Sequence, residues 1–188
     1  MGLDMYLIRK KYVGANLEHR KVKGKIELEI EGKKLPIEFD RLSYIDEEVG
    51  YWRKANAIHK WFVDNVQDGN DDCKEYSVSM EDLEKLLELC KLVKKTAVVK
   101  MGKIQNGYRY ENGKEIPIME DGEYIENVDE IATILPTQDG FFFGNVGYNE
   151  YYLADINKTI EIIEKLIKDE KEMNELGFYS EFVYSSSW

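Results

Sequence analysis

The chain has 188 residues, of which 43% are hydrophobic and 12% aromatic. This composition excludes a disordered protein and predicts one folded domain over 1–188. The 26 basic and 37 acidic residues give a net charge of −11, which repels phosphate backbones and argues against direct nucleic-acid binding. No apolar run approaches the length of a membrane span and the start lacks a signal-peptide pattern, so we expect a cytoplasmic protein with no membrane contact.

The first part of the chain shows β patterns. Residues 2–13 are rich in Leu, Tyr, Ile and Val, which favours a strand. Apolar and charged residues alternate strictly over 25–31, residues 32–34 turn the chain, and the alternation resumes over 35–39. This pattern predicts a hairpin with one solvated face, and Pro36 places its second strand at an edge because proline donates no ladder hydrogen bond.

Helical periodicity follows. Over 47–66 one face of a helix collects Val49, Trp52, Asn56, His59, Val63 and Val66. A polar loop over 67–74 separates this helix from a second one, which we expect to begin after Ser79. The run Ser79 to Asp82 has the form of a capping box, and Cys90 falls on the apolar stripe, which predicts a buried thiol.

The second half of the chain mixes turns, strands and a third helix. Residues 97–131 resemble an insertion, since Asn-Gly pairs at 106 and 112 and an Asp-Gly pair at 121 separate short β-like pieces. The three phenylalanines at 141–143 predict a central strand, 150–171 a helix, and 177–188 a final strand. We therefore predict an α+β fold: a mainly antiparallel sheet with three helices packed mostly on one face.

The most informative segment for function is 50–62. In the predicted helix Trp52, Asn56 and His59 share one face, and Arg53 and Lys60 border it. Buried polar groups need partners, so the amide and imidazole either bond to the core or line a pocket. A pocket of this kind suits a nucleotide-derived ligand, because indole stacks on a base and guanidinium pairs with phosphate.

Two neighbouring features bear on this pocket. Residues 143–150 lead from the predicted strand through two glycines into a helix, and Tyr148 in this loop is a further aromatic group that can stack on a ligand. Such a loop can bind an anion or simply connect the elements tightly. Trp61 points away from Trp52, so the helix is either almost enclosed or forms an interface, for example in a homo-oligomer.

Catalytic and metal-binding patterns are not evident. The only histidines are His19 and His59, too few for a multi-histidine zinc site, and we expect no metal and no cofactor. Residues 64–75 match a calcium loop poorly, because Val66 supplies no ligand, and they favour a solvated acidic loop instead. A catalytic Cys–His pair would need Cys73 or Cys90 beside His59, and no motif supports that pairing.

Several blocks resemble an uncharacterised family of phage and prophage proteins: MGLDMYL at the start, GYWRKANAIHKWF at 50–62, GFFFG at 140–144, YNEYY at 148–152 and YSSSW at the end. The resemblance implies that the β-rich stretches 20–40 and 97–131 are elaborations of a shorter domain. It also implies a counter-defence role, without supplying catalytic residues.

Three hypotheses follow from these observations. The first is a non-catalytic sponge for a nucleotide-derived host immune signal, held by Trp52, Arg53, Asn56, His59, Lys60 and Tyr148. The second is a protein-level inhibitor that binds a host defence nuclease or sensor through its acidic surface and β insertions. The third is a small hydrolase that depends on His59.

Overall fold

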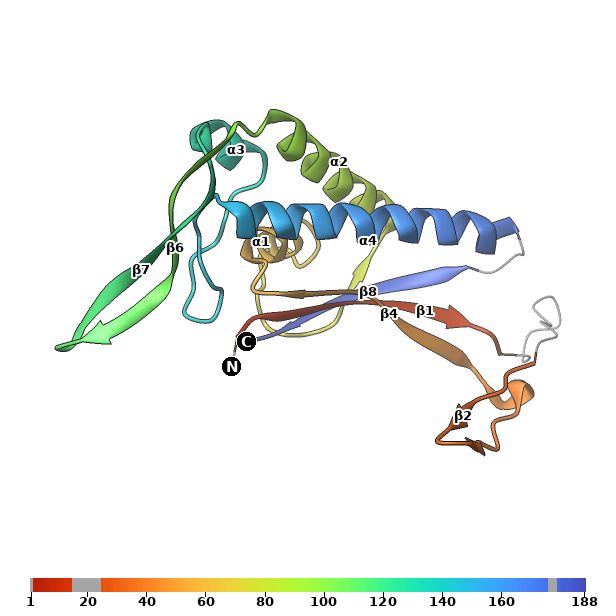
Figure 1. The fold of residues 1–188 in the computed structure, drawn as a ribbon. Helices are drawn as coiled ribbons and strands as arrows, with labels where there is room; N and C mark the ends of the chain where they lie inside the picture. The colour runs from red at the N-terminus through yellow and green to blue at the C-terminus, as the bar shows by residue number, and fades with distance from the viewer. Residues whose placement is uncertain (1, 15–24, 176–178) are drawn as a thin grey trace.

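The computed structural model describes residues 2–14, 25–175 and 179–188 (Figure 1). His19 and the first two residues of the predicted last strand lie outside the described residues. The fold is α+β, as the sequence predicts.

A four-stranded antiparallel sheet forms the centre of the molecule. Its strands are β1 (Asp4–Tyr12), β4 (Tyr44–Arg53), β5 (Tyr76–Val78) and β8 (Ser180–Ser187), in the order β4-β1-β8-β5. The predictions of a first and a last strand are therefore confirmed, whereas the sequence patterns gave no signal for the three-residue β5.

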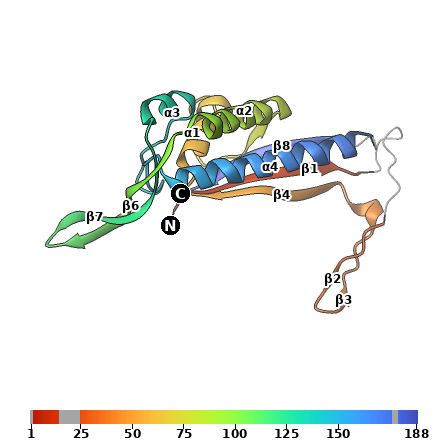
Figure 2. The same cartoon turned by 45° about the horizontal axis from the view of Figure 1, so that its top comes forward.

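The helices lie on one side of this sheet (Figures 1 and 2). They are α1 (Asn56–Asn65), α2 (Met80–Thr96), α3 (Val128–Ile134) and α4 (Glu150–Glu175), one more than predicted. At the start of α2 the Ser79 side chain accepts from the backbone of the third helical residue, which confirms the capping box. Among the described helices, none is both long and apolar enough to cross a membrane.

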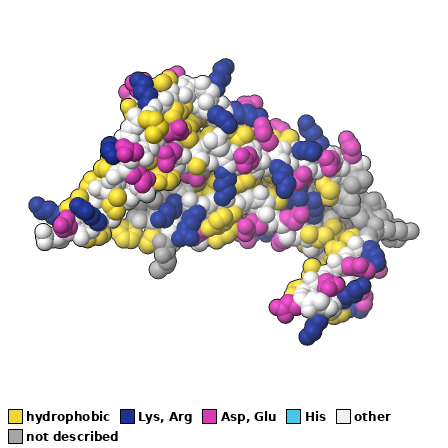
Figure 3. Space-filling model, viewed as in Figure 1, with side chains coloured by type: hydrophobic (Ala, Val, Ile, Leu, Met, Phe, Trp, Pro, Cys, Tyr) yellow, Lys and Arg dark blue, Asp and Glu magenta, His cyan; other side chains and the backbone are white. Residues whose placement is uncertain are grey.

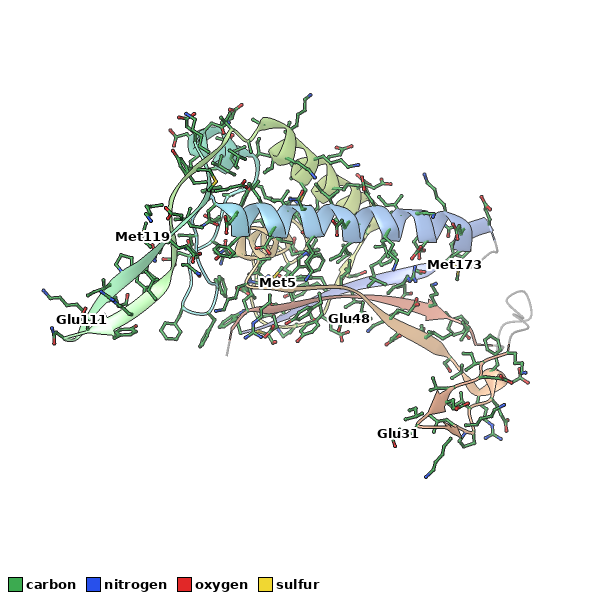
Figure 4. All side chains as sticks on the ribbon, viewed as in Figure 1. Met5, Glu31, Glu48, Glu111, Met119 and Met173 are labelled. Atoms are coloured by element: carbon green, nitrogen blue, oxygen red, sulfur yellow. The ribbon has the colours of Figure 1, made fainter. Side chains whose placement is uncertain are left out.

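The core lies between the sheet and the helices, because alternate side chains of each strand point toward the helices. In β1 these include Met5 and Leu7, which are fully buried, as is Leu3 just before the strand. Tyr184 of β8 stacks on Phe62 of α1, with ring centroids 3.9 Å apart and planes within 8° of each other. Met5 is labelled in Figure 4, where it lies in the sheet below α4.

The predicted helix over 47–66 is wrong in its first half. Residues up to Arg53 belong to β4, and only Asn56–Asn65 are helical. Lys54, with a φ of +59°, separates the two elements. A β-carbon on Gly50 would lie 3.2 Å from the Ile162 side chain of α4, so glycine allows the helix to approach the strand closely.

The predicted central strand over 141–143 is also wrong. These residues form a turn between α3 and α4, in which Phe143 is buried while the Phe141 side chain is 94% exposed. The backbone carbonyl of Phe142 accepts from Leu3 N, which attaches this turn to the end of the sheet. The three consecutive phenylalanines therefore do not form a strand that is buried on both faces. The ring of Phe143 is buried, and the ring of Phe141 is exposed to solvent.

Two ribbons project from the sheet-and-helix body. The longer one, here called the arm, pairs β6 (Val99–Glu111) with β7 (Lys114–Ile125) around a turn at Asn112 and Gly113, as predicted. The Asp-Gly pair at 121 lies inside β7 and makes no turn, contrary to expectation. Figures 1 and 2 show that the arm extends from the helix layer at one end of the body and the second ribbon from the sheet at the other end, with both tips on the side away from the helices.

The second ribbon is the predicted hairpin near the N-terminus. It pairs β2 (Glu29–Ile30) with β3 (Lys33–Lys34), and its turn is formed by Glu31 and Gly32, both with positive φ, one residue before the expected turn. The expected apolar face exists, but the body does not cover it. Its members, all more than a third exposed, are Leu28, Ile30, Leu35 and Ile37.

One titratable group on α4 gives a pH-dependent prediction. Burial raises the pKa of Asp155 from 3.8 to about 7, against the opposing charge of Lys158. The raised folded-state pKa means that the ionised carboxylate opposes folding, so its penalty grows as the pH rises from about 4 to 7. Asp155→Asn is therefore expected to raise the free energy of unfolding by roughly 1–3 kcal/mol at pH 8.

The measurement is urea denaturation of Asp155→Asn and wild type at pH 5 and pH 8. The gain is expected to be larger at pH 8. The exposed Glu161 of the same helix supplies the control, and Glu161→Gln is expected to leave stability unchanged at both pH values. A gain in Asp155→Asn that is the same at both pH values would contradict the assignment.

Candidate functional site

The residues predicted to line a pocket do not share an open face. Trp52 points from β4 into the core, where its side chain is 1% exposed and its Nε1 donates to Thr159 Oγ1 of α4 at 2.9 Å. Arg53, the next residue of the strand, points to the other face of the sheet, and its exposed guanidinium lies 4.0 Å from the Asp4 carboxylate. The indole and the guanidinium therefore cannot act on one ligand from the same side.

Asn56 is buried at the start of α1 and bonds to the loop before α4. Its Nδ2 donates to the carbonyl oxygens of Phe143 and Asn145, at 3.1 and 2.9 Å. Its Oδ1 accepts from Gln138 N at 3.2 Å. All three partners are backbone groups, so the amide holds residues 138–145 in place.

His59 is fully buried one turn later and also has protein partners on both nitrogens. Nδ1 lies 2.7 Å from the Tyr184 hydroxyl, and Nε2 lies 3.0 Å from Asp71 Oδ2. The other oxygen of Asp71 accepts from Trp188 Nε1 at 3.0 Å. The histidine thus connects the core of the sheet to the acidic loop, and neither ring nitrogen is directed at a cysteine.

The remaining predicted residues lie elsewhere. Lys60 forms an ion pair with Asp64 one turn along α1, at 2.8 Å. The Tyr148 hydroxyl accepts from Thr137 N at 3.1 Å, and its ring packs against Tyr152 with centroids 4.9 Å apart. Of the six predicted residues, the structure brings only Asn56 and His59 close to the same buried side of α1, and their polar atoms bond within the protein.

A shallow cavity of about 220 Å³ lies between α1, α2 and the end of α3. Lys60 and Asp64 contribute to its lining, and the rest of the lining is mostly apolar, with Trp61, Leu89 and Pro136. Typical small-molecule pockets hold about 300–1,000 Å³, so this cavity is too small to enclose a nucleotide. Trp61 itself is buried, which resolves the two sequence alternatives for α1 in favour of an almost enclosed helix.

The two cysteines differ in their exposure to solvent. Cys90 is fully buried in α2, as predicted, and burial raises the pKa of its thiol to about 12, so it stays protonated at neutral pH. Cys73 is exposed in the loop after α1. Within the described part of the chain, no three His, Cys, Asp or Glu side chains cluster closely enough to hold a metal ion.

The feature that the sequence patterns did not identify is the apolar surface of the arm. In β7, residues 115, 117 and 119 share one face because they alternate along the strand. Pairing across the ribbon places Tyr110 opposite Glu115, Tyr108 opposite Pro117, and Gln105 opposite Met119. Tyr108, Tyr110 and Met119 are respectively 57%, 75% and 51% exposed, so one face of the arm presents large side chains to solvent.

The loop before α4 is attached to strand β6 of the arm. Asn145 Nδ2 donates to the carbonyl oxygen of Gln105 at 2.5 Å, and Gln105 is the cross-strand neighbour of Met119. The same loop carries the exposed side chains of Phe141 and Val146. We call Tyr108, Tyr110, Met119, Phe141 and Val146 the arm–loop surface.

Figures 3 and 4 show where this surface lies. Hydrophobic side chains follow the projecting arm and reappear on the β2–β3 hairpin at the other end of the molecule (Figure 3). Met119 lies partway along the arm, and Glu111 marks its far end (Figure 4). The sequence did contain a signal for this surface, because Tyr and Arg alternate before the turn of the insertion. The alternation alone could not show that the tyrosines are exposed, because their exposure depends on whether another element covers them.

Comparisons of the chain with protein-family models, with curated protein sequences and with solved structures find no match.

Proposed function

We propose that this protein is a non-catalytic binding protein that engages another protein through the arm–loop surface. The observation that carries the proposal is a long two-stranded ribbon with Tyr108, Tyr110 and Met119 exposed on one face. Aromatic side chains expose about 150–250 Å² each when free, so the two tyrosines and Phe141 together offer several hundred square ångströms. Exposed apolar surface of that extent usually marks an interaction site.

The composition of the surface supports a protein partner. Tyrosine is enriched at the energetic centres of protein interfaces, and methionine adapts its shape to irregular partners. The β2–β3 hairpin offers a second set of exposed apolar residues at the opposite end of the sheet, with Leu28 and Ile30 among them. A two-stranded hairpin is only marginally stable alone, so a partner that covers this face would also stabilise it.

Of the hypotheses drawn from the sequence, a protein-level inhibitor has the better support. The small-molecule sponge requires the polar atoms of Asn56 and His59 to face an open cavity, and these atoms bond to the protein's own groups instead. The resemblance to phage and prophage proteins favours a host defence nuclease or sensor as the partner, in the host cytosol.

The test is a quantitative pull-down from host lysate with wild type and the variant Tyr108→Ser/Tyr110→Ser/Met119→Ser. We expect wild type to retain one protein stoichiometrically, and the triple variant to retain it at least tenfold less well, because truncated interface centres lose much of the binding energy. Leu92→Ser, on an exposed position of α2, is the matched control and is expected to bind as wild type does.

Circular dichroism must show that the triple variant remains folded. Equal retention by wild type and the triple variant would contradict the proposal, and so would the absence of any retained protein. A thermal shift with cyclic nucleotides or ADP-ribose derivatives, equal in wild type and the triple variant, would favour the sponge instead.

A further inference from the structure

Strand β4 lies at an open edge of the central sheet. In the strand order β4-β1-β8-β5, β1 is the only neighbour of β4 among the described residues. Figure 2 shows β4 along one margin of the sheet, with α4 on the helix side. Ten residues are long for an unpaired edge, because proteins usually shorten or cover such edges to prevent association. The edge of β4 is therefore a place where another strand can add to the sheet.

The hydrogen bonds to β1 show which backbone groups of β4 face outward. At the two ends of the pairing, the backbones of Ser43 and Lys54 bond to residues flanking β1. Because the direction of these groups alternates along an antiparallel strand, every second residue counted inward from either end faces away from β1. The two counts meet at Val49, which the irregularity in the pairing leaves without a partner in β1. The outward-facing residues are thus Tyr44, Asp46, Glu48, Tyr51 and Arg53, and no printed contact of the described chain pairs their backbone groups on this side.

The sequence of β4 is complementary to itself when two copies pair antiparallel. If residue 49 of one copy lies opposite residue 50 of the other, outward-facing residues meet at each hydrogen-bonded position. Asp46 then lies opposite Arg53 of the second copy, and Glu48 lies opposite Tyr51. By two-fold symmetry each of these pairs occurs twice. The three consecutive acidic residues at 46–48 therefore never lie directly opposite one another.

The charges at the matched positions are available for pairing. Asp46 is exposed and forms no ion pair with any described residue, because its cross-strand neighbour Lys10 bonds to Glu75. The Arg53 side chain is 61% exposed, and its Nε lies 4.0 Å from Asp4 Oδ1, at the limit of an ion pair. A second copy would therefore supply each of these two side chains with a nearer partner of opposite charge.

The side chains also match in direction. Asp46 and Arg53 both point to the face of the sheet away from the helices, because each adjoins a residue of β4 that points toward the helices. A pairing shifted by two residues would place Asp46 opposite Tyr51, and Arg53 opposite Tyr44. That alternative keeps the backbone hydrogen bonds but loses both ion pairs, so charge distinguishes the two pairings.

We propose that a second copy of this chain pairs antiparallel with β4, with Asp46 of each copy opposite Arg53 of the other. The two four-stranded sheets then join into one continuous sheet, with the helices of both copies on the same side. The net charge of −11 on each copy opposes association. Physiological salt screens exposed charges that lie more than about 8 Å apart, so the side chains that face each other determine the pairing.

The test is the dimer dissociation constant, measured by analytical ultracentrifugation in about 0.15 M salt. We expect the wild type to form a dimer whose fraction rises with protein concentration. Asp46→Arg sets cation against cation at both symmetric positions, and Arg53→Asp sets anion against anion, so each is expected to weaken the dimer about tenfold. The double variant Asp46→Arg/Arg53→Asp restores opposite charges and is expected to return to within about threefold of wild type.

The matched control is Glu84→Arg on the exposed side of α2, which changes the net charge as Asp46→Arg does and is expected to leave the dissociation constant unchanged. Circular dichroism checks that every variant is folded. A wild type that stays monomeric at every concentration overturns the proposal. So does a dimer that neither reversal weakens, a double variant that does not recover, or an equal loss in Glu84→Arg.

This inference is independent of the proposed function, because β4 contributes no residue to the arm–loop surface. The variant Tyr108→Ser/Tyr110→Ser/Met119→Ser is expected to dimerise as the wild type does. Conversely, Asp46→Arg is expected to retain the host protein in the pull-down. Loss of dimerisation in the arm variant would contradict pairing through β4, whereas a monomeric wild type that still retains a host protein would leave the proposed function intact.

Discussion

Replacing Arg9 with methionine is expected to lower the free energy of unfolding by about 3–5 kcal/mol, because it removes the buried guanidinium that pairs with the buried Glu170 carboxylate. The Arg9 side chain points from β1 toward α4 and is 7% exposed. Its Nη1 lies 3.1 Å from Glu170 Oε1, and its Nη2 lies 2.7 Å from Glu47 Oε2. A fold of this size is stable by only about 5–15 kcal/mol, so the loss is large.

The size of the effect follows from what remains after the substitution. The Glu170 side chain is 7% exposed and, among the described residues, would keep only the Ser180 hydroxyl, at 3.0 Å, as a hydrogen-bond donor. An uncompensated buried carboxylate costs several kcal/mol, whereas methionine replaces most of the volume of the arginine. The cluster joins β1, β4, α4 and β8, so its loss weakens contacts between the sheet and the last helix.

The neighbouring Lys10 supplies the control. It points to the opposite face of β1 and pairs with the exposed Glu75 at 3.0 Å. Lys10→Met is expected to change stability by less than about 1 kcal/mol, as exposed ion pairs usually do. Guanidinium denaturation of both variants at pH 7 measures the difference, and a loss in Arg9→Met as small as that in Lys10→Met would show that the cluster does not stabilise the fold.

The same ionic cluster predicts how the free energy of unfolding falls at low pH. Burial alone would raise the pKa of Glu47, but the hydrogen bonds and charges of Arg9 and Lys11 outweigh it and lower the pKa below 4.5. A lowered folded-state pKa means that this carboxylate stabilises the fold above about pH 4.5, and that the contribution disappears as the pH falls through the folded-state value. Wild type is therefore expected to lose stability below pH 4.5 more steeply than Arg9→Met.

Much of the body could be predicted from the sequence, because its signals are local. The capping box at Ser79 and the apolar stripe that contains Cys90 specify α2 without reference to the rest of the chain. The 150–171 prediction falls within α4 for the same reason, since its buried residues recur at helical spacing. The α+β class follows once these elements are combined with strands at both ends.

The predictions of secondary structure were wrong where one sequence pattern fits two structures. Val49, Trp52 and Asn56 fall on one face of a helix, but residues 44–53 also suit a strand, and pairing with β1 decides between the two. The sequence cannot reveal that pairing, because β1 lies about 40 residues away. The positive φ of Lys54, which ends the strand, has no signature in the residue type.

The predicted site failed for a related reason. A polar residue on an apolar helix face either bonds to the core or faces a cavity, and Asn56 and His59 found their partners in segments distant in the sequence. The exposed apolar face of the arm was not predicted, because alternating apolar and polar residues normally indicate that the apolar face is buried. At Leu28 and Ile30, and along the arm, apolar and polar residues alternate, but the apolar side chains remain exposed among the described residues. Exposure of this kind becomes visible only when the fold is known.

Asn56 connects the core to the proposed binding surface, and this gives the last prediction. Its amide bonds to Phe143 O and Asn145 O, and Asn145 in turn donates to Gln105 O of the arm. Asn56→Ala would leave two carbonyls and the N–H of Gln138 without this partner. Each unpaired buried group costs about 1–3 kcal/mol, so we expect the free energy of unfolding to fall by about 2–4 kcal/mol.

The loss is expected to be concentrated in the loop that carries Phe141. Hydrogen exchange should become faster over residues 137–145 while amides in α2 keep their relative protection. The control is Asn65→Ala at the end of the same helix, where Nδ2 donates only to Trp61 O, and it should leave exchange in the loop unchanged. If the loop were held mainly by its own turns, Asn56→Ala and Asn65→Ala would give the same exchange pattern. A faster-exchanging loop in Asn56→Ala alone would mean that the buried amide, predicted from the sequence to recognise a ligand, instead holds the loop that presents Phe141.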